Sequence, residues 1–214
     1  MNGGSEAFLE AVDSFDYSGY DFLEGLPGGS NRPAALEGFL YPDTYNFMSD
    51  DPPEYLIQSM LDNFDSKVTQ DMRDQAEAME LSLYEVITLA SIVEREAAIA
   101  DERPIIADVY LNRLESGMRL EADPTVQYPL GKEGAWWPKL GREDTSNTDS
   151  PYNAYLNGGL PPGPICNPGL DSILAVLNPE DTNYLFFVAI GDSGEHVFAE
   201  TYEQHEQNIQ QYGG

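Results

Sequence analysis

Basic residues, cysteine and histidine are scarce in this sequence. Its 214 residues include 10 Lys and Arg against 38 Asp and Glu, which gives a formal net charge of −28 at pH 7. Binding to nucleic acid or to anionic lipid needs a basic surface, so the charge argues against both partners. With one cysteine, Cys166, and two histidines, no intramolecular disulfide is possible. We expect neither a metal site nor a cofactor, because multi-cysteine and His-rich ligand sets are missing.

Long apolar runs are missing as well. No stretch of about 18 apolar residues occurs, so we expect no membrane-spanning segment in this chain. Met1 is followed by a polar stretch, which does not resemble a signal peptide. Hydrophobic residues still make up 41% of the chain and aromatic residues 11%. The length and composition therefore predict a folded core in one domain, or two small ones.

The middle of the chain has apolar residues at helical spacing. Residues 53–79 show this spacing, and a second helix begins at the capping box of Ser82 and Glu85 and runs to about Ala98. A third helix follows Pro104. We therefore expect a helical bundle in this half of the chain.

The second half of the chain reads differently. Residues 120–170 are expected to be mostly irregular, with a Pro/Gly-rich loop that no helix or central strand accommodates. Residues 184–190 and 195–199 predict a β-hairpin, and Thr201 opens a terminal helix with a second capping box. The fold class predicted is α+β: a helical bundle packed with a small antiparallel sheet and a long Pro/Gly-rich loop.

Two glutamates near the end of the second helix are the first candidates for chemistry. On a helical wheel, Glu94 and Glu96 flank a broad apolar face in directions roughly 200° apart, so they cannot serve one small pocket together. Burial beside apolar groups raises the pKa of a carboxyl group and makes it a general acid near neutral pH. The alternative is that each glutamate pairs with Arg103 or Arg113 at the edge of the core. On the pattern alone we prefer this alternative.

Other candidates lie in the irregular region. Asp123 precedes a proline and suits either a simple Asx turn or a polar site. The tyrosines and the asparagine of residues 150–155 suit sugar binding, or a surface loop with a buried tyrosine. Trp136 and Trp137 suit a carbohydrate platform or a loop anchor. His196 alternates with apolar neighbours and is expected to be a packing residue.

These segments together carry a resemblance to a known family. They are, in order, E-G-F-L-Y-P-D-T-Y (37–45), L-A-S-I-V-E-R-E (89–96), V-Y-L-N-R-L (109–114), M-R-L-E-A-D-P-T-V-Q-Y (118–128), S-P-Y-N-A-Y (150–155), G-L-P-P-G-P-I (159–165) with N-P-G (167–169), and the hairpin segments Y-L-F-F-V-A (184–189) and H-V-F (196–198). Each is weak alone, but collinear and suitably spaced they form a specific match. The chain resembles the endolytic murein transglycosylases, the MltG or YceG-like family.

The resemblance implies an activity and a location. Family members are lyases that cut peptidoglycan glycan strands between N-acetylmuramic acid and N-acetylglucosamine without water, leaving 1,6-anhydro-muramyl ends. They are usually held outside the membrane by one N-terminal helix and work beside glycan-polymerising synthases. We expect residues 1–36 to be an N-terminal extension and residues 37–214 to be the catalytic domain. The anchor and most of a LysM-like region are then missing from this chain.

The resemblance also implies roles for individual residues. The catalytic acid is expected at the first glutamate of the S-I-V-E-R-E motif, Glu94. Glu96 and Asn112 are expected to support it. The expected substrate-binding residues are Asp123, Gln127, Tyr152, Asn153, Tyr155 and Pro162. Ala154 stands where the family is expected to have threonine, which puts a substrate-binding role for that position in doubt.

Two alternatives remain open for the function. One is a noncatalytic peptidoglycan-binding or cell-division scaffold module of the same fold. The other is a muramidase that uses water and needs a second carboxylate, for which Asp123 is the candidate. A lytic transglycosylase needs one carboxyl group only, because the C6 hydroxyl of the substrate is the nucleophile.

Overall fold

The computed structural model describes residues 4–24, 26, 36–48, 50–141 and 143–213. The regular structure in these residues consists of helices and one two-stranded antiparallel sheet, which confirms the α+β prediction. The longer helices are α1 (Gly4–Ser14), α2 (Pro53–Lys67), α3 (Gln70–Ala78), α4 (Leu83–Glu96), α5 (Arg103–Glu115), α6 (Asp123–Leu130), α8 (Leu170–Leu177) and α9 (Tyr202–Tyr212). The short elements are η1 (Asp21–Leu23), η2 (Ala100–Glu102), α7 (Asp144–Asn147), β1 (Phe186–Ala189) and β2 (His196–Ala199).

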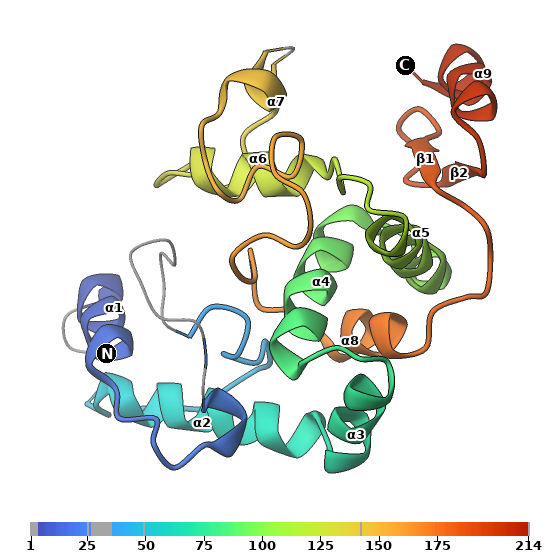
Figure 1. The fold of residues 1–214 in the computed structure, drawn as a ribbon. Coiled ribbons are helices and arrows are strands. Elements are labelled where there is room, and N and C mark those ends of the chain that lie inside the picture. Colours follow the sequence, from blue (N-terminus) through green and yellow to red (C-terminus); the bar gives the residue numbers. More distant parts are fainter. Residues whose placement is uncertain (1–3, 25, 27–35, 49, 142, 214) are drawn as a thin grey trace.

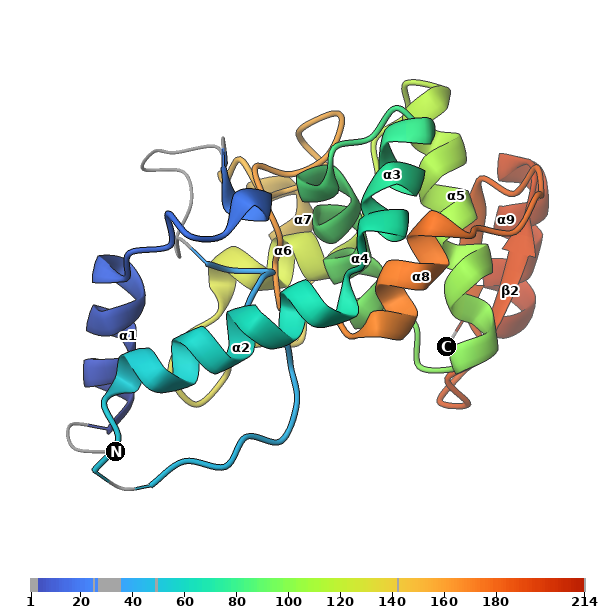
Figure 2. The same ribbon diagram turned by 90° about the horizontal axis from the view of Figure 1, so that it is seen from below.

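Helix α4 lies at the centre of the molecule (Figure 1). It begins at the predicted capping box, in which Ser82 and Glu85 satisfy each other's free backbone amides. All eight residues from Val86 to Val93 are buried, because α5 and α8 pack along this helix. A helix that is covered on several sides is expected to be apolar nearly all round, as this one is. Figure 2 shows α2 and α8 on the side of α4 that is seen from below.

Two predictions of secondary structure were wrong in part. The helical stretch 53–79 is divided into α2 and α3, because Thr69 leaves the helix and its side chain caps the amide of Met72. Within the segment expected to be irregular, residues 123–130 form helix α6. Pro124 is tolerated there because a proline in the first turn of a helix removes an amide that has no partner in any case. Asp123 is therefore the first residue of a helix rather than part of an isolated turn.

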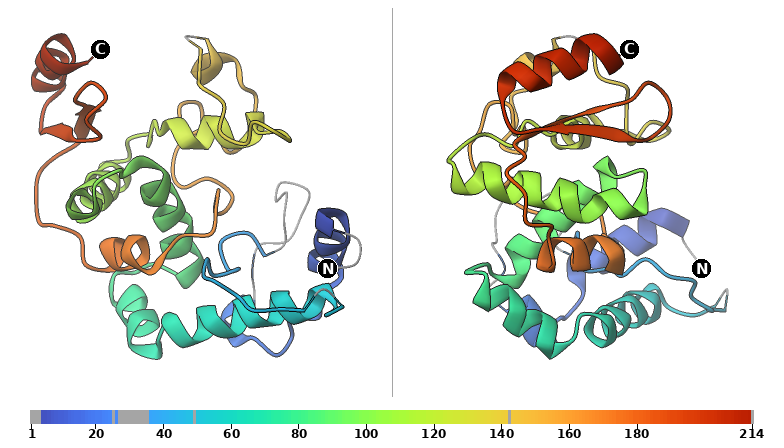
Figure 3. Two further views of the ribbon diagram at one scale, coloured as in Figure 1. Left: turned by 180° about the vertical axis from the view of Figure 1, so that it is seen from behind. Right: turned by 90° about the vertical axis from the view of Figure 1, so that its right-hand side faces the viewer.

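The predicted hairpin forms and pairs Phe187 with Phe198. With α9 it makes a C-terminal unit that stands beside α5, as the right-hand view of Figure 3 shows. Side chains of α5 hold the entry to this unit. The Arg113 Nε donates to the Leu185 carbonyl at 2.6 Å, and the Asn112 amide donates to the Thr182 and Tyr184 carbonyls. The position of the hairpin is thus fixed by residues on the helix that also faces α4.

The segment 36–40 is fixed against the Pro/Gly-rich loop on the other side of the molecule. The Asn167 side-chain oxygen accepts hydrogen bonds from the amides of Gly38 and Leu40. Gly38 has a φ of +93°, and a β-carbon there would lie 2.4 Å from a side-chain atom of Pro164. Glycine is required at this position because the backbone and the proline ring meet so closely.

The N-terminal residues share the same core. Ala11, Val12 and Leu23 are buried together with residues of α2 and α4 in one cluster. The expected boundary at residue 36 stays a prediction, and residues 27–35 lie outside the described part of the chain. Among the described helices, none is long and apolar enough to cross a membrane.

Candidate active site

The two glutamates of α4 have partners on different helices. Glu94 Oε2 accepts hydrogen bonds from Ser172 Oγ at 2.6 Å and from the Gly169 amide at 3.3 Å, both at the start of α8. Glu96 Oε1 accepts a hydrogen bond of 2.8 Å from the Tyr110 hydroxyl on α5. The divergence agrees with the helical wheel, which places the two side chains in different directions.

The expected arginine partners of these glutamates were wrong. Among the described residues, neither Glu94 nor Glu96 forms an ion pair. Arg113 instead pairs with Glu121 at 3.2 Å and donates to the carbonyls of Arg119 and Leu120. Neutral donors therefore hold both carboxyl groups.

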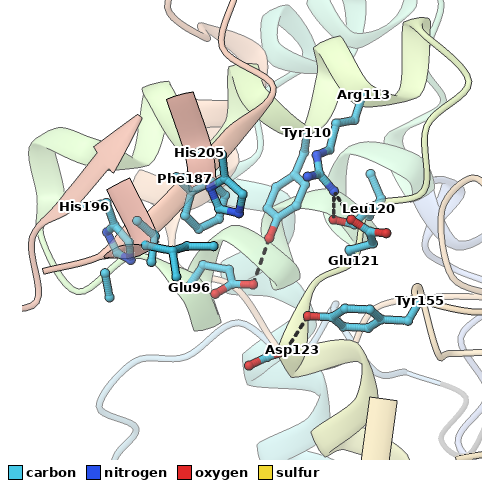
Figure 4. A pocket seen from close by; sticks show the side chains of 13 residues that line it. Glu96, Tyr110, Arg113, Leu120, Glu121, Asp123, Tyr155, Phe187, His196 and His205 are labelled. Atoms are coloured by element: carbon cyan, nitrogen blue, oxygen red, sulfur yellow. Dashed lines mark hydrogen bonds and ion pairs between the residues drawn. The ribbon is translucent and has the colours of Figure 1, made fainter. Parts of the chain in front are cut away.

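Glu96 faces a pocket of about 440 Å³ between the end of α4, α5, the start of α6 and the C-terminal unit (Figure 4). Its polar lining comes from helices α4, α5, α6 and α9, from the connecting segments and from β2, and its apolar lining comes largely from β1. The lining residues are Glu96, Tyr110, Arg113, Leu120, Glu121, Asp123, Tyr155, Phe187, Val188, Ala189, His196, His205 and Ile209. The pocket therefore joins a carboxyl group in partly apolar surroundings to several hydrogen-bonding groups.

Burial dominates the electrostatics of Glu96. The pKa of this carboxyl group is raised from 4.5 to about 7, mainly by burial, and the negative charge of Asp123 acts in the same direction. The hydrogen bond from Tyr110 and the positive charge of Arg95 act in the opposite direction. A carboxyl group with such a pKa is partly protonated at neutral pH, which is the condition for general acid catalysis.

Two tyrosine hydroxyls complete the polar part of the pocket. Tyr155 donates a hydrogen bond of 2.7 Å to Asp123 Oδ1, as Figure 4 shows. Burial and the charge of Asp123 raise the pKa of Tyr155 above its usual value. Burial and the nearby Glu96 likewise raise the pKa of Tyr110. Both phenols therefore stay protonated at neutral pH and act as hydrogen-bond donors.

His196 forms part of the wall of the pocket and is held by η2. Its Nδ1 lies 2.7 Å from Glu102 Oε2, and its amide donates to the other oxygen of the same carboxylate. The ring of Phe187 meets the imidazole edge to face at 5.3 Å. The prediction of a packing histidine with satisfied hydrogen bonds is confirmed.

Four of the residues expected to bind substrate occupy the same region but have different surroundings. Tyr155 and Asp123 line the pocket together. Asn153 has no exposed surface, and its amide donates to the carbonyls of Thr145 and Thr148. Tyr152 is 3% exposed and packs against Tyr128 with ring centroids 4.9 Å apart. These buried positions do not suit direct contact with a glycan, so Asn153 and Tyr152 organise the loop that presents Tyr155.

The other expected residues also support the fold. The Gln127 amide donates to the Pro138 carbonyl, and the Pro162 carbonyl accepts a hydrogen bond from Tyr84. Asn112 bonds Asp108 and the chain before β1, so it supports the hairpin rather than a glutamate of α4. Sequence reasoning missed Tyr110 as a pocket residue. Its helical spacing indicated only a core position, and the hydroxyl was the signal that it needed a partner.

Comparison with known proteins identifies the family. Residues 6–211 match the model of the YceG-like family. The chain belongs to this family. It is 39% identical over 178 residues to a Bacillus subtilis (strain 168) protein named endolytic murein transglycosylase. The match covers 83% of this chain and 48% of that protein. A Streptococcus pneumoniae (strain D39) protein of the same name is 36% identical over 218 residues, covering 97% and 39% of the two chains.

A solved structure supports the same assignment. The crystal structure of a putative yceG-like protein from Listeria monocytogenes has a TM-score of 0.76 with this chain at 35% identity. The match covers 95% of this YceG-like chain and 63% of that one. The chain spans about half the length, or less, of the two named relatives. The family and the fold are therefore established.

Proposed function

We propose that the chain is the catalytic portion of an endolytic murein transglycosylase. It cuts peptidoglycan glycan strands between N-acetylmuramic acid and N-acetylglucosamine and leaves 1,6-anhydro-muramyl ends. The names of the relatives support the substrate and the reaction class. The observation that carries the proposal is Glu96, a carboxyl group with a pKa of about 7 that faces a pocket lined by further hydrogen-bonding groups.

One carboxyl group is sufficient for this reaction. Protonated Glu96 donates its proton to the glycosidic oxygen, and the bond between that oxygen and the muramyl C1 breaks. The C6 hydroxyl of the same sugar attacks C1 and gives its proton to the Glu96 carboxylate, which restores the acid. The products are a 1,6-anhydro ring and a free 4-hydroxyl group. Because the nucleophile belongs to the substrate, proximity replaces a bound water molecule.

The pocket supports Glu96 rather than Glu94 as the acid. Glu94 accepts two hydrogen bonds from the first turn of α8 and so ties two core helices together. Glu96 has a single hydrogen bond from Tyr110, lines the pocket and has the raised pKa. The assignment of the acid to Glu94, made from the resemblance, is the alternative that the experiment must decide.

A water-using muramidase is the second candidate, and one observation favours it. Asp123 lines the same pocket as Glu96, so a second carboxylate is available. In a hydrolase this carboxylate would act on water or on the sugar, and the product would have a reducing end. The chemistry of the product ends separates the two functions.

The proposed activity also implies where the chain acts. Peptidoglycan lies outside the cell membrane, so the chain would act on the extracytoplasmic face. The relatives extend well beyond the matched region. We propose that the remainder of the full protein supplies a single-pass anchor, and that glycan-polymerising synthases are its partners.

The test is a digest of purified peptidoglycan, read by mass spectrometry. The wild-type chain, Glu96→Gln and Glu94→Gln are compared after circular dichroism has shown that all three fold. We expect anhydro-muramyl products from the wild type and from Glu94→Gln, and none from Glu96→Gln. Activity in Glu96→Gln with none in Glu94→Gln would reverse the assignment. Reducing-end products would establish a hydrolase, and an inactive wild type would favour a noncatalytic binding module.

A further inference from the structure

A surface rich in aromatic and cationic side chains lies beside the acid, on the loop that follows α6. We call it the Trp136 ledge and define it as Arg95, Lys132, Trp136, Trp137 and Lys139. Arg95 stands between Glu94 and Glu96 on α4, and its guanidinium lies 4.0 Å from the centroid of the Trp137 ring. Trp136 is 65% exposed, although tryptophan is usually well buried. The ledge is therefore connected to the helix that carries the acid.

The backbone of the loop holds Trp136 outward. Lys132 and Ala135 pair through two backbone hydrogen bonds, and the Pro138 carbonyl accepts a hydrogen bond from Gln127 on α6. At Gly131 a β-carbon would lie 2.6 Å from the Trp136 carbonyl oxygen, so the turn closes tightly. The two tryptophans thus have different roles, one as a loop anchor and the other as a candidate carbohydrate platform. Trp137 anchors the loop between Tyr128 and Arg95, and Trp136 remains for an external ligand.

The charge of the ledge differs from that of the protein. Among the ion pairs of the described residues, none involves Arg95, Lys132 or Lys139. The loop from residue 131 to residue 143 adds two exposed carboxylates, Glu133 and Glu143, beside these three cations. The chain as a whole has a net charge of −28. Three cations gathered on a protein of this net charge provide a local attraction for an anionic ligand.

We infer that the Trp136 ledge is a saccharide subsite outside the pocket. The indole of Trp136 stacks on the apolar face of a pyranose ring, and Arg95, Lys132 and Lys139 attract carboxylates carried by the strand. The inference rests on the proposed function and extends it. A pocket of about 440 Å³ holds only a short stretch of a polymeric glycan, so the strand must continue over the surface. The ledge offers the chemistry that such a strand requires, beginning one residue from Glu96.

The test measures binding separately from cleavage. All variants are made in the Glu96→Gln background, which removes the proposed acid. The probe is a glycan strand freed of its stem peptides by an amidase, so that each muramyl residue carries a lactyl carboxylate. Binding is followed by titration calorimetry for the parent, Trp136→Ala, Arg95→Gln and a control, Tyr55→Ala. Tyr55 is 51% exposed on α2, away from the ledge.

We expect Trp136→Ala to weaken strand binding roughly three- to tenfold, the range for losing one aromatic contact. Arg95→Gln should weaken it and reduce its dependence on salt. Tyr55→Ala should bind as the parent does. Equal affinities of Trp136→Ala and Tyr55→Ala, or a parent that does not bind strands, would overturn the inference.

Two further outcomes distinguish related possibilities. If the ledge serves a lipid surface, the parent will bind phosphatidylglycerol vesicles, Trp136→Ala will not, and strand binding will be the same in both, which overturns the inference. If the wild type cuts no peptidoglycan but Trp136→Ala still weakens strand binding, the subsite stands and the proposed reaction fails. If peptidoglycan is cleaved normally but Trp136→Ala leaves strand binding unchanged, the proposed reaction stands and the subsite inference fails.

Discussion

The Tyr110 hydroxyl donates a hydrogen bond of 2.8 Å to Glu96, and this bond favours the charged form of a carboxyl group that burial drives toward the neutral form. The pKa of about 7 is the balance of these two effects with the charges of Asp123 and Arg95. Each neighbour can be changed separately. The pH dependence of cleavage therefore reports on the assignment of Glu96 as the acid.

The first prediction concerns Tyr110→Phe. A general acid must be protonated, so wild-type activity should be lost as the pH rises through about 7. Removing the hydrogen bond destabilises the carboxylate and raises the pKa of Glu96, so the alkaline limb should move to higher pH by about one pH unit. The measurement is kcat/KM on glycan strands between pH 5 and 9. A limb that stays in place, or moves to lower pH, would argue against Glu96.

The second prediction concerns Asp123→Asn, which should shift the limb in the opposite direction. The negative charge of Asp123 raises the pKa of Glu96, and the neutral amide removes this effect. The asparagine oxygen can still accept the hydrogen bond from Tyr155. We expect an active enzyme whose alkaline limb lies at lower pH. Complete loss of activity at every pH would instead identify Asp123 as the second carboxylate of a hydrolase.

The third prediction concerns the stability of Glu96→Gln. In the folded chain the pKa of Glu96 is about 7, above its ordinary value of 4.5, so the folded state holds the proton more tightly. The wild-type free energy of unfolding should therefore fall as the pH rises from about 4.5 to 7, by roughly 3 kcal/mol, and then stay level. Glutamine cannot ionise, so the free energy of unfolding of Glu96→Gln does not include this decrease.

Urea denaturation at pH 5 and pH 8 measures the effect. Glu96→Gln should gain stability relative to the wild type between the two pH values. Glu94→Gln serves as the control, because it leaves Glu96 in place and should follow the wild-type dependence on pH. A parallel response of wild type and Glu96→Gln would mean that Glu96 is ionised in the folded chain at pH 5.

The fourth prediction concerns the contact between segment 36–40 and the Pro/Gly-rich loop. Gly38→Ala would place a β-carbon 2.4 Å from Pro164 and 2.9 Å from Ile87, at a φ of +93°. We expect destabilisation of roughly 3 kcal/mol or more, because both the contact and the backbone become strained. At Gly158 no atom lies within 4 Å of the added carbon, so Gly158→Ala is the matched control. Similar melting temperatures for the two variants would contradict this account of the loop.

The sequence contained much of the fold but only part of the site. The capping boxes at Ser82 and Thr201 and the hairpin are local patterns, and the structure has all three. Helix α6 was missed because Asp123 before Pro124 indicated a turn, whereas Pro124 lies in the first turn of a helix, where proline is tolerated. The helical wheel separated the directions of Glu94 and Glu96. It did not show which direction opens on a pocket, because residues far along the chain complete that pocket.

The loop around residue 153 shows a similar limit. Tyrosine and asparagine side by side are typical of sugar sites, but also of loops that hold themselves in place by side-chain hydrogen bonds. The Asn153 side chain donates to the carbonyls of Thr145 and Thr148, in α7 and at its C-terminal end, and accepts a hydrogen bond from the amide of Tyr155. Of Tyr152, Asn153 and Tyr155, only Tyr155 lines the pocket. Only the tertiary packing shows that Asn153 supports the loop and that Tyr155 lines the pocket.

The C-terminal unit has a consequence for the order of events during synthesis. Phe187, Val188 and Ala189 belong to the wall that removes Glu96 from water, and they are made well after α4. Chains fold from the N-terminus as they are synthesised. A nascent chain without the hairpin would have Glu96 solvated, and its carboxyl group would be ionised at neutral pH. With Glu96 as the proposed acid, the chain would be able to protonate a sugar only after its last strands have docked, and an incomplete chain would be inactive.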